Sequence, residues 1–108
     1  MPYVFIYSVF PSNKGKDVAK VYVEEIKNFR PAARGLSKEI ISGAIKGTMD
    51  GIGNIIVHDI KEGKLEEFLD LQQKAMVPYH DIEGFKYNIE VRAKVTEALE
   101  WIGMKMPE

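Results

Sequence analysis

Hydrophobic and polar positions follow the same succession of patterns in the two halves of the chain. In the first half, residues 3–10 are aromatic and β-branched, which favours a strand, and residues 17–29 carry apolar side chains at helical spacing. The segment RPAARG, residues 30–35, is expected to end that helix, with Pro31 and Gly35 as the stop signals. Residues 36–47 favour a second strand, and the Asp-Gly pair in TMDGIG is typical of a hairpin turn.

The second half repeats this order. Residues 54–60 favour a strand, and residues 65–79 place apolar side chains on one helical stripe. Residues 85–92 alternate cleanly, with apolar side chains at the odd positions and polar ones at the even positions. This strand is therefore expected to have one buried face. Residues 94–106 predict a short closing helix.

The predicted fold is an α+β, ferredoxin-like arrangement in one domain, residues 1–108. Right-handed crossovers turn the order βαββαβ into an antiparallel sheet with both main helices on one face, followed here by the closing helix. In this topology the first and third strands are central. Consistent with that place, residues 3–10 and 54–60 are apolar on both faces, whereas residues 85–92 are apolar on one.

The side of the sheet without helices is expected to be unusually apolar. We place the aliphatic residues at positions 4, 6, 55 and 57 under the helices, because they form the most uniform aliphatic sets. An apolar open face must be covered, either by the closing helix or by a partner subunit, so a homodimer or higher homo-oligomer is expected. The side chains then expected on the open face are Tyr3, Phe5, Tyr7, Asn54, Ile56 and His58.

Composition excludes several classes of function. The net charge is −1 and only three arginines occur, so no basic surface is available for nucleic acid. The chain has no cysteine, which excludes disulfides and thiolate sites, and we expect no metal and no cofactor. The first ten residues lack a basic segment and a cleavage site and are too short to span a membrane. We interpret them as a strand of a cytoplasmic protein without a membrane partner.

The two histidines both stand in the tripeptide HDI. Adjacent strand residues point to opposite faces, so His58 and Asp59 are not expected to act as a pair. His80 is predicted in a surface turn, one helix length of about 22 Å from His58. His58 is the candidate acid/base of a pocket, with Tyr7 and Asn54 orienting a ligand. The alternative is a structural histidine whose hydrogen bonds are satisfied in a dimer core.

Three further residues are ligand-binding candidates. Tyr3 shares the face of Tyr7 on the first strand. Glu90 and Arg92 lie two residues apart on one face of the fourth strand and could hold a polar ligand. The alternative is that they are solvated charges, which edge strands commonly carry.

The region NIIVHDIKEGKLEEFLDLQQKAMVPYHDIEGFKYNIEVR resembles the dimeric α/β-barrel superfamily, which includes small antibiotic-biosynthesis-type monooxygenases and related stress proteins. The resemblance implies two sheets packed face to face across a dimer, with a ligand in each half, and a polar set of Asn, Trp and His in catalytic members. Asn54 and His58 lie on the expected pocket-facing strand, whereas Trp101 lies in the tail, outside the pattern. The elements that carry the resemblance are Lys61–Lys64, Glu66–Leu69, Pro78, Gly84, Phe85 and Arg92.

Two functions follow as hypotheses. The first is a small homodimeric protein that binds a small organic molecule on the open sheet face, and the resemblance implies a cofactor-independent oxygenase or isomerase if it is an enzyme. The second is a non-catalytic interaction or regulatory module whose aromatic sheet face is only an oligomer interface. A cavity lined by Tyr7, Asn54 and His58 would favour the first, and a filled interface the second.

Overall fold

The computed structural model describes residues 1–107. Within these residues the strands and main helices follow one another in the predicted order βαββαβ, with a closing helix, and two short 3₁₀ turns are added. The elements are β1 (Tyr3–Phe10), the 3₁₀ turn η1 (Ser12–Lys14), α1 (Gly15–Ala33), β2 (Ser37–Thr48), β3 (Gly51–Ile60), α2 (Leu65–Met76), the 3₁₀ turn η2 (Val77–Asp81), β4 (Lys86–Arg92) and α3 (Val95–Trp101).

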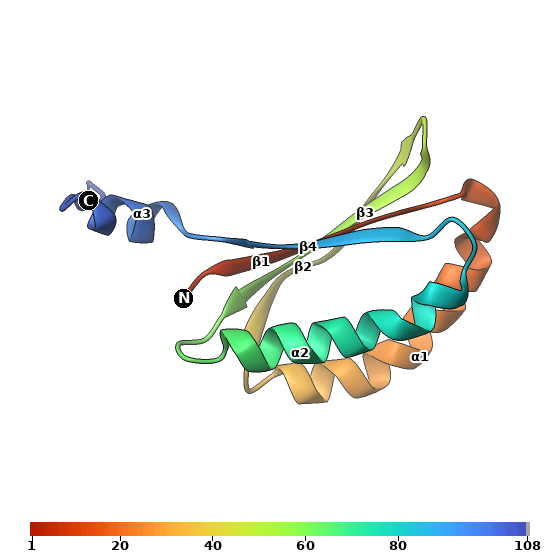
Figure 1. The fold of residues 1–108 in the computed structure, drawn as a ribbon, viewed down its shortest axis with the longest axis horizontal. Helices are drawn as coiled ribbons and strands as arrows, with labels where there is room; N and C mark the ends of the chain where they lie inside the picture. Colours follow the sequence, from red (N-terminus) through yellow and green to blue (C-terminus); the bar gives the residue numbers. More distant parts are fainter. Residues whose placement is uncertain (108) are drawn as a thin grey trace.

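The four strands form one antiparallel sheet in the order β2-β3-β1-β4. Helices α1 and α2 lie side by side under one face, and no helix or strand within residues 1–107 covers the opposite face (Figure 1). This is the ferredoxin-like α+β fold, with β1 and β3 in the centre, and it confirms the prediction. No helix within residues 1–107 combines the length and the apolar character that crossing a membrane requires.

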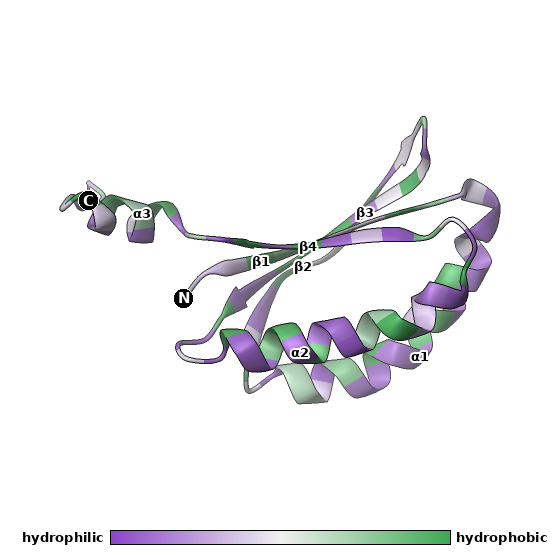
Figure 2. Cartoon of the chain, in the orientation of Figure 1, coloured by the Kyte–Doolittle hydropathy of each residue, from purple (hydrophilic) through white to green (hydrophobic). Residues whose placement is uncertain are grey.

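The core lies between the sheet and the two helices. Val4 and Ile6 of β1 are 0% and 2% exposed and meet Phe68 of α2 and Phe29 of α1. This confirms that the even positions of β1 face the helices. Each helix carries both hydrophobic and hydrophilic residues (Figure 2), as expected for helices that bury one side and expose the other.

Two helix ends lie near prolines. Helix α1 ends at Ala33, within the segment 30–35 where its end was predicted, although Pro31 itself lies inside the helix. A proline so close to a helix end removes only one backbone hydrogen bond, and the last turn is still closed by Arg34 N–H donating to the Arg30 carbonyl. Near Pro78 the chain tightens into η2 instead of continuing α2.

The β2–β3 hairpin is long and irregular. Its tip curls away from the helix layer (Figure 1). Two register shifts interrupt the pairing, one between Glu39 and Ile41 and one between Ile41 and Ala44, so β2 contains extra residues relative to β3. At the end of the turn, Gly51 has φ +128° and passes so close to the Phe10 carbonyl that a Cβ atom would lie 2.2 Å from its oxygen.

Helix α3 extends away from the rest of the molecule. It continues beyond the end of β4 and does not turn over the sheet (Figure 1). Its first turn is fixed by the Lys94 ammonium, 2.8 Å from the Asp59 carboxylate, and by the N-terminal amine of Met1, 3.1 Å from Glu97. Glu97 also accepts a hydrogen bond from the Lys94 backbone N–H over 3.0 Å, which satisfies one free donor at the start of the helix.

Candidate functional site

The predicted face of β3 is wrong. Val4 pairs with His58, and Ser8 pairs with Asn54, so both β3 residues point toward the helices with the even positions of β1. The opposite face takes Ile55 and Val57 instead. Both alternating sets of this strand are largely apolar, so the choice of the more uniform aliphatic set did not decide its orientation. The predicted cluster of Tyr7, Asn54 and His58 is therefore divided between the two faces.

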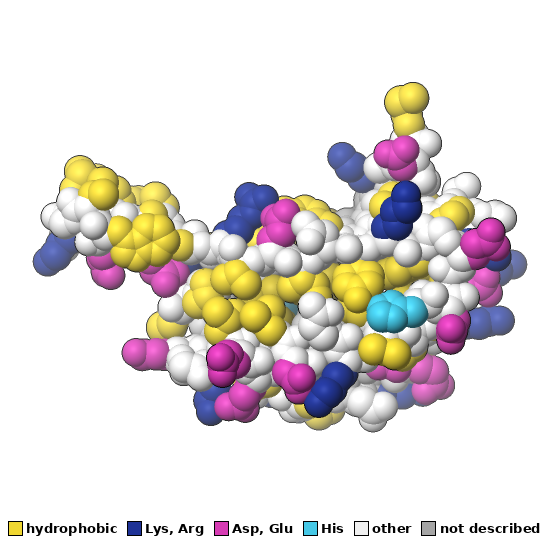
Figure 3. Space-filling view, viewed as in Figure 1, with side chains coloured by type: hydrophobic (Ala, Val, Ile, Leu, Met, Phe, Trp, Pro, Cys, Tyr) yellow, Lys and Arg dark blue, Asp and Glu magenta, His cyan; other side chains and the backbone are white. Residues whose placement is uncertain are grey.

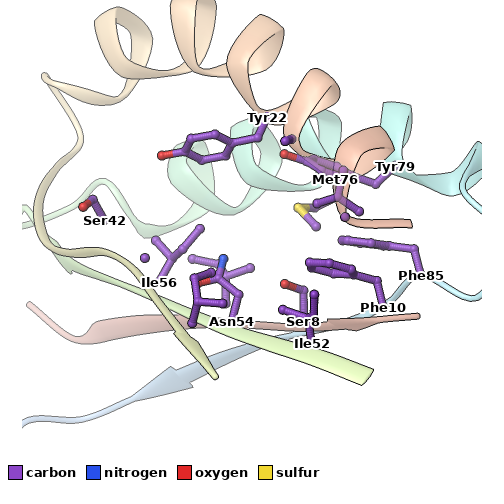
Figure 4. A pocket seen from close by; sticks show the side chains of 16 residues that line it. Ser8, Phe10, Tyr22, Ser42, Ile52, Asn54, Ile56, Met76, Tyr79 and Phe85 are labelled. Atoms are coloured by element: carbon purple, nitrogen blue, oxygen red, sulfur yellow. The ribbon is translucent and has the colours of Figure 1, made fainter. Parts of the chain in front are cut away.

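A cavity of about 480 Å³ lies between the sheet and the helices. Figure 4 shows that its floor is formed by β1 and β3 and its roof by α1 and the region where α2 meets η2. This size and this mostly apolar lining are typical of small-molecule sites. The residues that line it are Ile6, Ser8, Phe10, Gly15, Val18, Ala19, Tyr22, Ser42, Gly43, Ile45, Ile52, Asn54, Ile56, Met76, Tyr79 and Phe85.

Asn54 provides a polar group whose orientation in the cavity is fixed. Beyond the second register shift of β2, the Ala44 N–H donates to Asn54 Oδ1 over 3.1 Å. Because a backbone N–H only donates, the atom that it contacts must be the amide oxygen, and the NH₂ group must occupy the other branch. Asn54 therefore presents hydrogen-bond donors to the cavity, beside the Ser8 hydroxyl (Figure 4).

One end of the cavity is aromatic. The ring of Phe85 stacks on Tyr79 at 4.8 Å and on Phe10 at 6.1 Å, with interplanar angles of 18° and 10°. Tyr79 is 8% exposed, and burial, together with the nearby Glu25 and Tyr22, raises its pKa to about 12. This phenol therefore remains neutral at physiological pH and can donate a hydrogen bond.

His58 lies in a separate, buried polar cluster. It is 2% exposed, its Nδ1 lies 2.8 Å from the Ser37 hydroxyl, and its Nε2 lies 3.7 Å from a carboxylate oxygen of Glu39. The rings of Phe29 and Phe68 pack against the imidazole. Burial lowers the pKa of His58 to about 4, so the ring is neutral near pH 7. Glu39 in turn lies 3.5 Å from Arg30 at the surface.

Two smaller hollows border this cluster, and one of them also borders the larger cavity. One of about 200 Å³ opens beside Ser37, His58 and Arg34. Another, of about 40 Å³, is lined both by His58 and by Tyr22 and Tyr79 of the larger cavity. His58 therefore borders the same interlayer space as Asn54, but it does not line the cavity that Asn54 does.

The remaining predicted residues lie on the open face. Tyr3, Phe5 and Tyr7 form a half-buried aromatic row along β1, in which the Phe5 and Tyr7 rings stack at 6.0 Å. Arg92 lies over the Phe5 ring at 5.2 Å and forms a bidentate contact with Glu90 at 2.8 and 3.1 Å. Glu90 and Arg92 do share one face of β4, as predicted, but they are already paired with each other.

His80 occupies the exposed position that was predicted for it. It lies in η2, where its Nε2 is 3.0 Å from the Tyr87 hydroxyl and its ring stacks on Tyr87. The whole of α2 separates it from the strand that carries His58. The repeated HDI tripeptide therefore forms two unrelated environments.

Several cavity residues were missed by the sequence reasoning. Ser8 was a signal, because it is the only small polar residue in a central strand of aromatic and aliphatic side chains. Asp59 was another: the orientation predicted for β3 would have placed its carboxylate under the helices, where an unpaired charge is costly. Ser42 and Gly43 carried no such signal, because register shifts at an edge strand are not readable from alternation.

Comparison of the chain with family models, with curated proteins and with solved structures found no match. Within residues 1–107, no group of three or more His, Asp or Glu side chains is arranged to hold a metal ion.

Proposed function

We propose that this protein binds a small, largely apolar molecule carrying a hydrogen-bond acceptor in the cavity between its helices and its sheet. The observation that carries the proposal is the fixed amide of Asn54, whose NH₂ group is directed into an apolar space. A carbonyl or ether oxygen satisfies that group, whereas a purely hydrocarbon ligand leaves it unpaired at a cost. The stacked rings of Phe10, Phe85 and Tyr79 favour a flat ligand.

Binding is better supported than catalysis. General acid–base chemistry near neutrality needs a group whose pKa lies near the working pH. In the cavity, the pKa of Tyr79 is about 12, and His58, outside it, has a pKa of about 4. A catalytic role for His58 as oxygenase or isomerase base remains a hypothesis, and it would need a substrate that reaches the smaller hollow from the Asn54 side.

The resemblance to dimeric α/β-barrel proteins supports a proposal about how two copies of the chain assemble. It implies that two sheets pack face to face, which would cover the aromatic row of Tyr3, Phe5 and Tyr7. The ferredoxin-like order of the strands is compatible with that assembly. We therefore propose a homodimer in which each subunit keeps its own cavity on the helix side.

The test uses two probes of nearly equal shape, 2-acetylnaphthalene and 2-ethylnaphthalene, which differ in one carbonyl oxygen. The acetyl probe is expected to bind more tightly, by roughly two- to tenfold, because one neutral hydrogen bond contributes about 0.5–1.5 kcal/mol. Asn54→Asp keeps an oxygen for the Ala44 N–H but removes the donors, so this preference is expected to disappear. Dissociation constants from NMR titration of both probes measure the effect.

A matched pair of serine variants controls for non-specific binding. Ser8→Leu fills the cavity and is expected to abolish binding of both probes, whereas Ser12→Leu makes the same change at an exposed position of η1 and is expected to leave binding intact. Equal affinity of Ser8→Leu and wild-type protein for the acetyl probe would show that the probe binds elsewhere and would refute the proposal.

A second candidate function is supported by the open face. In this alternative the protein is a non-catalytic interaction or regulatory module, and the aromatic row of Tyr3, Phe5 and Tyr7 is its working surface. Failure of both naphthalene probes to bind wild-type protein would favour this alternative over ligand binding.

A further inference from the structure

We propose that α3 and residues 102–107 form an arm that packs on the open sheet face of a second copy of this chain, in a reciprocal exchange. The proposal does not rest on the ligand cavity, which lies on the other side of the sheet. It joins two apolar surfaces that belong to one chain and do not meet within it.

The arm exposes far more apolar surface than a short terminal helix in solution requires. Figure 3 shows hydrophobic side chains gathered on the projecting segment, apart from the body of the molecule. Exposed apolar side chains that form no core of their own are typical of protein interfaces. On the arm these are Val95 at 60%, Trp101 at 74%, Ile102 at 70%, Met104 at 54% and Met106 at 48% exposure.

The base of the arm is held in a fixed direction. The Lys94–Asp59 and Met1–Glu97 contacts tie the first turn of α3 to the ends of β1 and β3. These contacts direct the helix beyond the edge of its own sheet. Folding back onto its own open face would break them, whereas reaching a neighbouring molecule would not.

The receiving surface is the open face of the sheet. Tyr3, Phe5 and Tyr7 form its aromatic row, and Ile55 and Val57 of β3 lie opposite Tyr7 and Phe5 in the pairing. Aromatic residues on a half-buried surface of this kind are the side chains most enriched at interfaces.

The sizes and charges of the two surfaces agree. The exposed apolar side chains of one arm amount to roughly 500 Å², and two arms contribute about 1,000 Å², which reaches the lower limit for a specific interface before the sheets themselves are counted. Glu100 on the arm and Lys38 and Lys86 at the edges of the face make no ion pair within residues 1–107. A second copy supplies both the apolar match and the opposite charges.

Trp101 is the chain's only tryptophan, so its fluorescence reports directly on the arm. Sedimentation of the full chain is expected to give about twice the 12.3 kDa of one copy. The emission of Trp101 is expected to be shifted to the blue in the dimer. On dilution, mass and emission are expected to change together, because separating the copies returns the indole to water.

Two variants locate the contact and a third is the control. Ile102→Glu on the arm and Phe5→Gln on the face are each expected to weaken dimerisation at least about tenfold, since buried interface anchors carry most of the affinity. Val23→Glu, at a position of α1 that is 54% exposed on the helix side, is expected to leave it unchanged. Circular dichroism of all three variants verifies that they are folded.

Three results would overturn the proposal. A monomer with solvent-like Trp101 emission at every concentration shows that the arm has no partner copy. A monomer with blue-shifted emission shows that the arm folds onto its own domain. A dimer that is lost with Phe5→Gln but unaffected by Ile102→Glu shows that the faces associate without the arms.

Discussion

Acidification is expected to destabilise this protein through His58, and the variant His58→Gln isolates that effect. The imidazole is 2% exposed between Phe29 and Phe68, and burial lowers its pKa from 6.5 to about 4. Glutamine has a similar volume and can still hydrogen-bond with Ser37, but it does not titrate. The substitution therefore removes the titratable group and keeps most of the packing around it.

The direction and size of the effect follow from the two pKa values. Above pH 6.5 the ring is neutral in both the folded and the unfolded chain, and its contribution to stability is fully present. Between pH 6.5 and pH 4 the unfolded chain binds a proton that the folded chain does not, so stability falls as the pH falls. With a folded pKa of about 4, the loss approaches about 3 kcal/mol near pH 4 and then levels off.

The charged groups around the ring set the limit of this loss. The Glu39 carboxylate, 3.7 Å from Nε2, attracts the protonated ring, and Arg30, 3.5 Å from Glu39, opposes that attraction. The carboxylate lies nearer to the ring than the guanidinium does, so its attraction outweighs the repulsion. The value of about 3 kcal/mol is therefore an upper limit for the loss of stability.

Urea unfolding at a fixed protein concentration, repeated from pH 7.5 to pH 4, measures the effect. The free energy of unfolding of the wild type minus that of His58→Gln is expected to shrink by up to about 3 kcal/mol over this range. Carboxylates elsewhere titrate in both proteins and cancel in the difference. Parallel curves for the two proteins would show that His58 titrates equally in the folded and unfolded chains, and would refute the reasoning.

Two further predictions concern particular positions. His80→Ala removes only an exposed contact with Tyr87, so the free energy of unfolding is expected to change by less than about 0.5 kcal/mol, and a larger loss in urea titration would contradict the surface assignment. Gly51→Ala is expected to destabilise by about 1–3 kcal/mol, because φ is +128° and the added Cβ would lie 2.2 Å from the Phe10 oxygen. Gly47→Ala, with nothing within 4 Å of the new Cβ, is the matched control in the same urea titration, and equal effects of the two changes would count against this reasoning.

The orientation of a strand or helix was predictable where only one of its faces is apolar. Residues 85–92 alternate between apolar and polar, and β4 has this orientation, with Glu90 and Arg92 on the open face. The stripe along residues 65–79 is likewise buried at Phe68, Gln72 and Met76. In both elements the hydrophobic effect selects one face, so the sequence determines the orientation.

The candidate site was less predictable because β3 is apolar on both faces. His58 and Asn54 lie on one of these faces, and their partners Ser37 and Ala44 come from β2, the edge strand with two register shifts. Burying His58 has a cost that is offset by its hydrogen bond and aromatic neighbours, none of which is adjacent in sequence. A site assembled from such contacts depends on tertiary pairing, and alternation alone does not describe it.

The extra residues of β2 give the edge strand a length that differs from that of its partner. Gaining or losing one residue in this strand would shift Ser42, Gly43 and Ile45, which line the cavity. Shortening β2 at Gly43 would also remove the second register shift, beyond which the Ala44 N–H donates to Asn54 Oδ1. The direction of the Asn54 amide is thus coupled to the length of one exposed strand. In the proposed binding site, an insertion or deletion in β2 would change the polar group offered to a ligand and leave the buried core around Phe68 as it is.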